Sequence, residues 1–248
     1  MTDRERNIKI VVEYDGTNYH GWQRQPEHCT IQQCLEEAVE AVTQTCTTVH
    51  GAGRTDAGVH ALAQVANFRT RSRISIERFP LALNAHLPPD IAVKHAEEVR
   101  LDFHAQFDAK SKLYRYTLLN QQIRSPLLGR YAYRCWPELD VSLMQRAALH
   151  LLGEHDFSAF ETESRWERPR VRHVTRAEFI AEPPRIDFWI EANGFLYNMV
   201  RAIIGTLLLV GWRKLSCDDF RNIIASKDRT FAGPTAPPQG LCLMRVTY

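Results

Sequence analysis

The sequence predicts an α/β protein made of two ferredoxin-like units side by side. Three observations support this class. At about 150 residues per domain, 248 residues fit one large domain or two small ones. Segments with strand and helix periodicity follow roughly the order β-α-β(β)-α-β in each half, with a joint near residues 100–110. The hydrophobic content of 44% and the charged content of 24% are typical of a globular chain.

The elements of the first half follow from hydrophobic periodicity. Residues 8–15 alternate as a strand that ends in a D-G turn. Residues 30–43 carry apolar side chains at helical spacing, and Thr30 with Gln33 forms a T-x-x-Q capping box. A strand at 64–68, a helix at 77–85 with Pro80 in its first turn, and a strand at 91–99 complete this half.

The second half repeats this order. Residues 112–119 alternate as a strand, and Asp140 is predicted to cap a helix that buries Met144, Ala147, Ala148, Leu151 and Leu152. Strands are expected at 174–181 and 185–191. The other expected elements are a helix with an apolar stripe at 196–211, a helix capped by Ser216 that runs to Lys227, and a closing strand at 241–248.

Charge and hydropathy exclude several classes of protein. The net charge of +2 does not by itself favour any class of binding partner. The charged first residues contain no apolar core of a secretory signal, and the most apolar stretch, 196–210, is too short and too interrupted to cross a bilayer. A cytoplasmic protein that does not insert into a membrane is therefore expected.

The six cysteines contain no C-x-x-C pair, so we expect reduced thiols, several of them buried. A zinc site at His28, Cys29, Cys34 and His50 fits no common ligand spacing, and no metal is expected.

The most unusual segment is the glycine-rich stretch from Gly51 to Ala61. It fits neither the dinucleotide fingerprint nor the P-loop, since Asp56 and Val59 stand where glycine and lysine are required. It leaves a carboxylate, Asp56, on a stiff loop beside Arg54 and His60. Such a carboxylate stays ionised and suits a nucleophile or a base. The alternative interpretation is a turn in which Asp56 is a solvated cap.

Two further stretches could bind nucleic acid. Residues 110–134 interleave basic and tyrosine side chains without any acidic residue, as in proteins that stack bases and bind phosphates. The alternative is an amphipathic strand with tyrosines in the core. Residues 165–176 hold five arginines, but acidic neighbours also allow a solvated charged loop. Arg201 lies at the edge of an apolar helix, where a charge is usually paired or extends to solvent at the helix rim.

At these segments the chain resembles the TruA family of tRNA pseudouridine synthases. The motif GRTDAGVHA at 53–61 resembles that family's catalytic motif, and the likeness extends along nearly the whole chain. It includes EYDGTNYHGWQRQP, LNAHLPPDIAV, DFHAQFDAKSKLYRY, LLGEHDFSAF, NGFLYNMVR and GLCLMRV. The resemblance implies two RRM-like halves, 1–104 with the catalytic aspartate and 105–248 completing the site, which form a continuous mixed central sheet flanked by helices with a central cleft.

The resemblance also implies an activity and a set of site residues. Uridines at positions 38, 39 and 40 of the tRNA anticodon stem-loop would be isomerised to pseudouridine without cofactor or metal, by a homodimer. Asp56 would be catalytic, Arg54 would intercalate where the base leaves the helix, Tyr114 would stack on the uracil, and Arg201 would pair with Asp56.

Two alternatives come from other classes of protein. A catalytically silent tRNA-binding protein would keep the basic faces but would not need Asp56. A glycoside hydrolase would use Asp56 as nucleophile with a second carboxylate about 5 to 9 Å away. Asp102, Asp108 and Glu191 are the candidates, without support from a motif, and such an enzyme would release free uracil.

Overall fold

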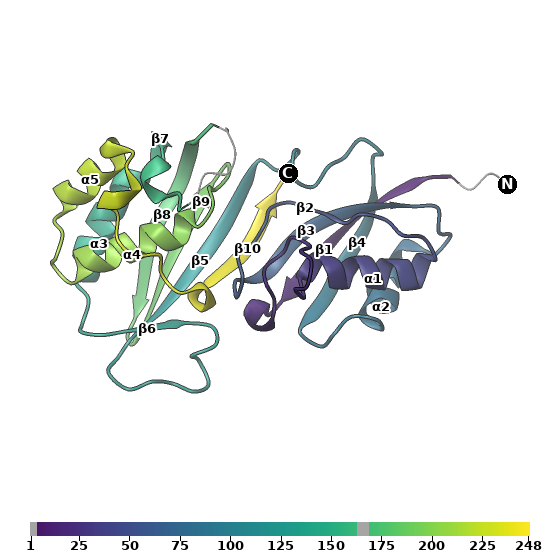
Figure 1. The fold of residues 1–248 in the computed structure, drawn as a ribbon, viewed down its shortest axis with the longest axis horizontal. Coiled ribbons are helices and arrows are strands. Elements are labelled where there is room, and N and C mark those ends of the chain that lie inside the picture. The colour runs from purple at the N-terminus through teal and green to yellow at the C-terminus, as the bar shows by residue number, and fades with distance from the viewer. Residues whose placement is uncertain (1–3, 163–168) are drawn as a thin grey trace. The chain divides into compact units, whose positions relative to one another are not determined.

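The structure is a computed structural model that describes residues 4–162 and 169–248 (Figure 1). Contacts within the chain divide it into two compact units, Met1–Lys110 with Cys242–Tyr248, and Ser111–Leu241. The expected functional halves, 1–104 and 105–248, stay a prediction. Among the described residues no helix is long and apolar enough to cross a membrane.

Unit 1 is a sheet with two helices against it. Its strands are ordered β4-β1-β3-β10, with β2 added beside β3. β1 is antiparallel to β3 and β4, whereas β10 is parallel to β3 through Cys242 opposite His60. The elements are β1 (Arg6–Tyr14), α1 (Ile31–Thr43), β2 (His50–Gly51), β3 (His60–Thr70), α2 (Phe79–Asn84), β4 (Ile91–Val99) and β10 (Leu241–Thr247).

Unit 2 repeats the plan with more helices. Its strands are ordered β5-β9-β8-β7, all antiparallel, and β6 lies parallel to β5. Helices α3, α4 and α5 pack on one another. The elements are β5 (Ser111–Asn120), β6 (Tyr133–Cys135), α3 (Val141–Ala148), β7 (Gly153–Asp156), β8 (Val171–Glu182), β9 (Arg185–Ala192), α4 (Met199–Gly211) and α5 (Cys217–Ser226).

The predicted fold class, a mixed α/β protein with sheets flanked by helices, is confirmed, and most predicted elements lie within two or three residues of their expected bounds. Thr30, Asp140 and Ser216 are N-caps whose side chains accept main-chain hydrogen bonds, as expected. The short strands β2, β6 and β7 were not predicted, since two to four residues carry too little periodicity.

Four details of the expectation were wrong. The Gln33 side chain donates to Glu37 one turn later instead of accepting from the Thr30 N–H, so only half of the capping box forms. α4 begins at Met199, because Asn198 adopts a left-handed φ of 58°. Leu152 is 39% exposed, because α3 gives way to a 3-10 turn. Of the six cysteines, all of which lie within the described residues, only Cys135 is buried.

Helix α4 is crossed at close range by the segment 232–236. A Cβ added at Gly205 would lie less than 3.0 Å from the Pro234 carbonyl oxygen, which is main chain and cannot turn away. The Gly233 N–H donates to the Thr206 hydroxyl at 2.9 Å and fixes this crossing. The absence of a side chain at Gly205 therefore sets how near the segment comes to α4.

We expect Gly205→Ala to lower the free energy of unfolding by about 2 kcal/mol or more, because the added methyl group overpacks a rigid contact. In a helix without this contact, the same change would stabilise by about 1 kcal/mol. The matched control is Gly194→Ala, whose new Cβ would meet the movable Arg172 side chain at 3.3 Å. Urea unfolding of the three proteins measures the difference, and a stabilised Gly205→Ala protein would refute the packing argument.

Candidate active site

The loop between β2 and β3, which carries Asp56, is anchored on several sides within unit 1. Trp22 N–H donates to the Thr55 carbonyl at 3.0 Å, and Gly58 N–H donates to the Tyr19 carbonyl at 3.3 Å. The Gln64 amide donates to the Gly53 carbonyl at 2.8 Å. Gly58 has φ of +76°, a conformation that glycine adopts without strain. The loop is therefore held in place through its main chain.

A buried hydrogen bond holds Thr55, the residue before Asp56. The hydroxyls of Tyr14 on β1 and Thr55 are 2.8 Å apart, and both residues are buried. Burial raises the pKa of Tyr14 well above its usual value, although hydrogen bonds to Thr55 and Gln64 oppose the rise. The phenol therefore stays neutral and ties the residue next to Asp56 to the central sheet of the unit.

We expect Tyr14→Phe to lower the free energy of unfolding by about 1 to 2 kcal/mol, because the Thr55 hydroxyl loses its buried partner. A double-mutant cycle with Thr55→Val tests the pair, and the second change should cost much less in the Tyr14→Phe background. Additive losses would show that the two hydroxyls act independently.

Gly16 and Gly21, both in the segment EYDGTNYHGWQRQP, let that segment lie directly against the Asp56 loop. A Cβ at Gly16 would lie less than 3.0 Å from the Val59 carbonyl oxygen. A Cβ at Gly21 would lie less than 3.0 Å from the Thr55 carbonyl oxygen. Gly21 also has φ of +84°. The segment 13–26 thus packs directly against the Asp56 loop.

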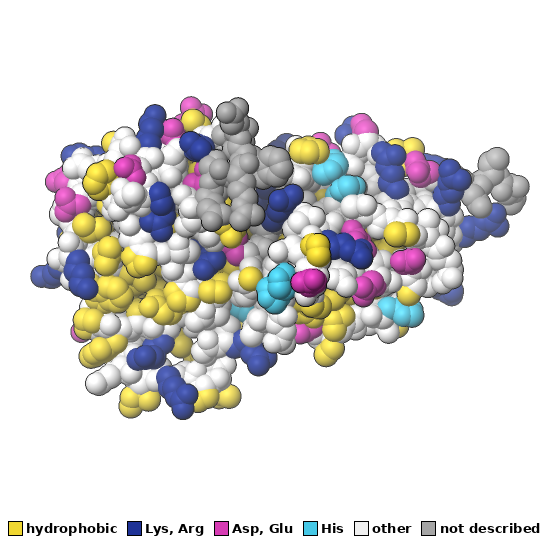
Figure 2. All heavy atoms as spheres, viewed as in Figure 1, with side chains coloured by type: hydrophobic (Ala, Val, Ile, Leu, Met, Phe, Trp, Pro, Cys, Tyr) yellow, Lys and Arg dark blue, Asp and Glu magenta, His cyan; other side chains and the backbone are white. Residues whose placement is uncertain are grey.

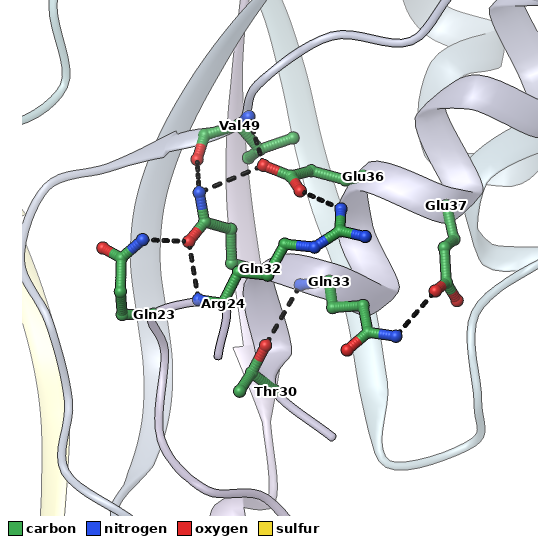
Figure 3. A network of polar contacts seen from close by, with 8 residues as sticks. All are labelled: Gln23, Arg24, Thr30, Gln32, Gln33, Glu36, Glu37 and Val49. Atoms are coloured by element: carbon green, nitrogen blue, oxygen red, sulfur yellow. Dashed lines mark hydrogen bonds and ion pairs between the residues drawn. The ribbon is translucent and has the colours of Figure 1, made fainter. Parts of the chain in front are cut away.

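Helix α1 fixes the chain that enters the loop (Figure 3). The Gln32 amide donates to the Val49 carbonyl at 3.1 Å and to Glu36 at 3.0 Å, and its oxygen accepts from the Arg24 N–H at 2.9 Å. The Glu36 carboxylate also accepts from the Val49 N–H at 3.2 Å. This network ties residue 49, just before β2, to the start of α1.

The loop presents two of the predicted site residues. Arg54 is exposed and Asp56 is partly exposed, two residues apart on the same anchored backbone. His60, expected beside them, is buried, and its Nδ1 accepts a hydrogen bond from the Gly16 N–H at 3.0 Å. This bond orients the imidazole at the start of β3.

Tyr114 lies in unit 2, on β5. It is 7% exposed and meets Phe195 edge to face, with ring centroids 5.1 Å apart. Two positions earlier on the same face, burial lowers the pKa of Lys112, and the charge of Arg172 lowers it further. A phosphate at this point would relieve the repulsion between the two cations.

Arg201 lies in the first turn of α4 and is half-buried. Its Nε donates to the Ala236 carbonyl at 2.8 Å, and Nη1 donates to the Asn198 side-chain oxygen at 2.7 Å. Asn198 in turn donates to the Thr162 hydroxyl at 2.7 Å. The guanidinium is therefore held in one orientation rather than extended freely into solvent. Neither support was predicted from the sequence, since Asn198 had no role of its own within the motif NGFLYNMVR and Ala236 is an ordinary residue in a loop segment.

The two basic stretches are partly structural. Tyr116 is a core tyrosine whose hydroxyl donates to the Pro237 carbonyl at 2.7 Å, and Arg115 and Arg176 both lie over the Trp189 ring. Arg170 pairs with Glu161 at 3.0 Å, as in a charged loop. Arg165 and Arg168 lie outside the described residues.

The surface and the possible metal ligands add little to the site. Basic and acidic side chains are mixed over the visible face of unit 1 (Figure 2), in line with the net charge of +2. In the parts of the chain that the structure describes, no group of three or more His, Cys, Asp or Glu side chains could hold a metal ion. His28 stacks on His20, and the rings of His50 and His104 are in tilted contact.

Comparison with known proteins gives one consistent result. A sequence profile described as tRNA pseudouridine synthase matches residues 10–108 and 147–248. The tRNA pseudouridine synthase A proteins of Thermoanaerobacter sp. (strain X514) and Acetivibrio thermocellus are each 48% identical over 243 residues, 98% of this chain and all of each relative. That of Geobacter sp. (strain M21) is 46% identical over 244 residues, 98% of this chain and 99% of the relative.

Proposed function

This chain belongs to the tRNA pseudouridine synthase family, and on that premise we propose that Asp56 starts the isomerisation of uridine at positions 38, 39 and 40 of the tRNA anticodon stem-loop. The enzyme is an isomerase that acts on tRNA uridine. One observation carries the assignment of Asp56: it is a partly exposed carboxylate on a loop whose main chain is anchored by Trp22, Tyr19 and Gln64. A reacting group gains most when such an anchor fixes its position.

The rearrangement involves no net oxidation or reduction, and it needs one ionised carboxylate. The bond between uracil N1 and ribose C1′ breaks, the base rotates, and a bond forms between C5 and C1′. The hydrogen on C5 leaves as a proton, and N1 takes up a proton. Asp56 would begin this sequence either by attacking C1′ or by removing a proton from the sugar.

The target uridine must first leave its stack, which costs a few kcal/mol. Arg54, exposed on the same anchored loop, is proposed to enter the space that the base vacates. Its guanidinium plane can stack on the neighbouring bases and offset part of the cost. Because Arg54 is two residues from Asp56, base extrusion and chemistry are coupled through a single loop.

Tyr114 is proposed to stack on the uracil while it is out of the helix. Its ring is held edge to face by Phe195, so little side-chain freedom is lost when a base stacks on it. We propose that Arg201, oriented by Ala236 and Asn198, pairs with the Asp56 carboxylate and keeps it ionised.

We expect Tyr114→Ala to lower kcat/KM by about ten- to a hundredfold, because base stacking contributes about 1 to 3 kcal/mol. Tyr114→Phe keeps the ring and should retain most of the stacking. Steady-state kinetics of both variants measure the two contributions, and Tyr116→Phe, which changes a buried hydroxyl bonded to Pro237, is the matched control. A Phe variant as impaired as the Ala variant would show that the hydroxyl of Tyr114 matters and that stacking does not.

The enzyme is further proposed to act in the cytoplasm as a homodimer in which one tRNA contacts both subunits. Position specificity can be tested with three tRNA transcripts, each with uridine at only one of positions 38, 39 and 40. Chemical labelling of pseudouridine should detect product at that position in every transcript. Product elsewhere in the tRNA would overturn the assignment of positions. Binding without product would favour a silent tRNA-binding protein, and free uracil would favour a glycoside hydrolase.

A further inference from the structure

Two thiols lie in contact at the start of α1. The Sγ atoms of Cys29 and Cys34 are 3.9 Å apart. Cys29 is exposed, in the segment just before α1, and Cys34 is half-buried in the first turns of α1. The function proposed above uses neither of them.

The two thiols differ in their access to solvent. Burial is the main cause that raises the pKa of Cys34, and the neighbouring Cys29, Glu37 and Asp90 raise it further. Cys34 therefore attacks only slowly at neutral pH, because the thiolate is the attacking form, and its suitability rests on its position beside Cys29. An oxidant from solution reaches the exposed Cys29 first, and Cys34 is in place to attack the product.

We propose that Cys29 and Cys34 are a site of reversible oxidation by peroxides and that the disulfide they form slows the isomerisation of tRNA uridine. The Cys29 sulfur attacks one peroxide oxygen, the O–O bond breaks, and the departing oxygen leaves as water with the thiol proton. Cys34 sulfur then attacks the resulting sulfenic sulfur. The S–O bond breaks, and this oxygen leaves as a second water with the Cys34 proton. Two thiols are oxidised to a disulfide, and one peroxide is reduced to two waters.

Closing the bond moves the Cys29 segment. A disulfide holds its sulfurs about 2.05 Å apart, so atoms now 3.9 Å apart must approach by roughly 1.9 Å. Cys34 belongs to a regular helix that packs on the sheet, whereas Cys29 lies in a connecting segment. Most of the movement therefore falls on Cys29.

Hydrogen bonds carry this movement to the Asp56 loop. The Cys29 carbonyl accepts from the His20 N–H at 2.9 Å, and the Trp22 carbonyl accepts from the Gln32 N–H at 3.0 Å. On its other side, the Trp22 N–H donates to the Thr55 carbonyl at 3.0 Å. The segment 20–22 thus lies between the thiol pair and the residue before Asp56. This coupling rests on the role proposed for Asp56.

The test starts from the fully reduced enzyme, whose activity is measured first. Brief treatment with hydrogen peroxide is followed by alkylation, cleavage after glutamate and mass spectrometry. Cleavage after Glu27 and Glu36 places Cys29 and Cys34 on one peptide, residues 28–36, and Cys46 on another. The expected result is a 28–36 peptide that has lost two hydrogen atoms, with activity at least about tenfold lower and restored by dithiothreitol.

Matched variants separate the pair from general oxidation. Cys29→Ser and Cys34→Ser should each keep full activity after the same treatment, whereas Cys46→Ser, which removes another exposed thiol, should respond like the natural protein. If the 28–36 peptide stays reduced while Cys46 is oxidised, or if the disulfide forms without loss of activity, the proposal is overturned. A reduced enzyme as active with Asp56→Asn as without it would instead refute the proposed function, and peptide mapping would still decide whether the disulfide forms.

Discussion

Asp56→Asn is expected to lower the rate of pseudouridine formation by at least about a thousandfold, while tRNA affinity changes by less than about twofold. Asparagine has nearly the shape of aspartate, so the anchored loop should keep its conformation. It cannot act as a carboxylate nucleophile or as a base. Single-turnover formation of pseudouridine and a tRNA-binding titration measure the two effects separately.

The matched control for this prediction is Asp102→Asn, which neutralises an exposed carboxylate of unit 1 that pairs with Arg100. It should leave the rate within about twofold, because exposed ion pairs contribute little. The control also tests one of the second carboxylates that a glycoside hydrolase would need. An Asp56→Asn protein that keeps a tenth or more of the rate would contradict the assigned role.

Arg201→Lys is expected to lower kcat/KM by about thirtyfold to several thousandfold, although the positive charge is kept. Removing one partner of a hydrogen-bonded, partly buried charge pair costs about 2 to 5 kcal/mol. Arg201 bonds Ala236 through Nε and Asn198 through Nη1, and a single lysine ammonium cannot reproduce this fork. Kinetics with saturating and limiting tRNA should show the loss mainly in kcat.

Arg213→Lys is the matched control, since Arg213 follows the same helix and forms an exposed pair with Asp140. It should change kcat/KM by less than about twofold. In Arg201→Met the acid limb of the pH–rate profile should also move to higher pH, because a carboxylate without a cationic partner takes up a proton more readily. An unchanged limb with a large loss of rate would mean that Arg201 supports the fold and does not pair with Asp56.

Periodicity was sufficient to predict long elements but not exact ends. The alternation of Ile8, Ile10 and Val12 predicted β1, and all three are fully buried. The start of α4 was wrong by three residues, because Leu196 is buried like the helix residues that follow it. An apolar stripe records which side chains are buried, and it does not show where the backbone stops being helical.

Candidate site residues could be named from the sequence only where a side chain carries chemistry itself, and their roles stay predictions. Asp56 was distinctive because a carboxylate between an arginine and a histidine on a glycine-rich loop is rare among ordinary turns. The residues that hold its loop were not distinctive, since Tyr14 was part of an ordinary predicted strand and Gln64 began another. Cys29 and Cys34 were considered together only as ligands of a zinc site, because their direct contact depends on the turn of the chain before α1. Contacts of this kind arise from tertiary packing, which leaves no periodic pattern in a single sequence.

The most direct test of the central claim measures tritium release from tRNA labelled at uracil C5, with the natural enzyme and Asp56→Asn side by side. Isomerisation expels the C5 hydrogen, because C5 becomes the atom bonded to ribose. We predict that the natural enzyme releases tritium together with pseudouridine and without free uracil, and that Asp56→Asn releases none while it still binds tRNA. Equal release by both proteins, or release by neither, would contradict the account.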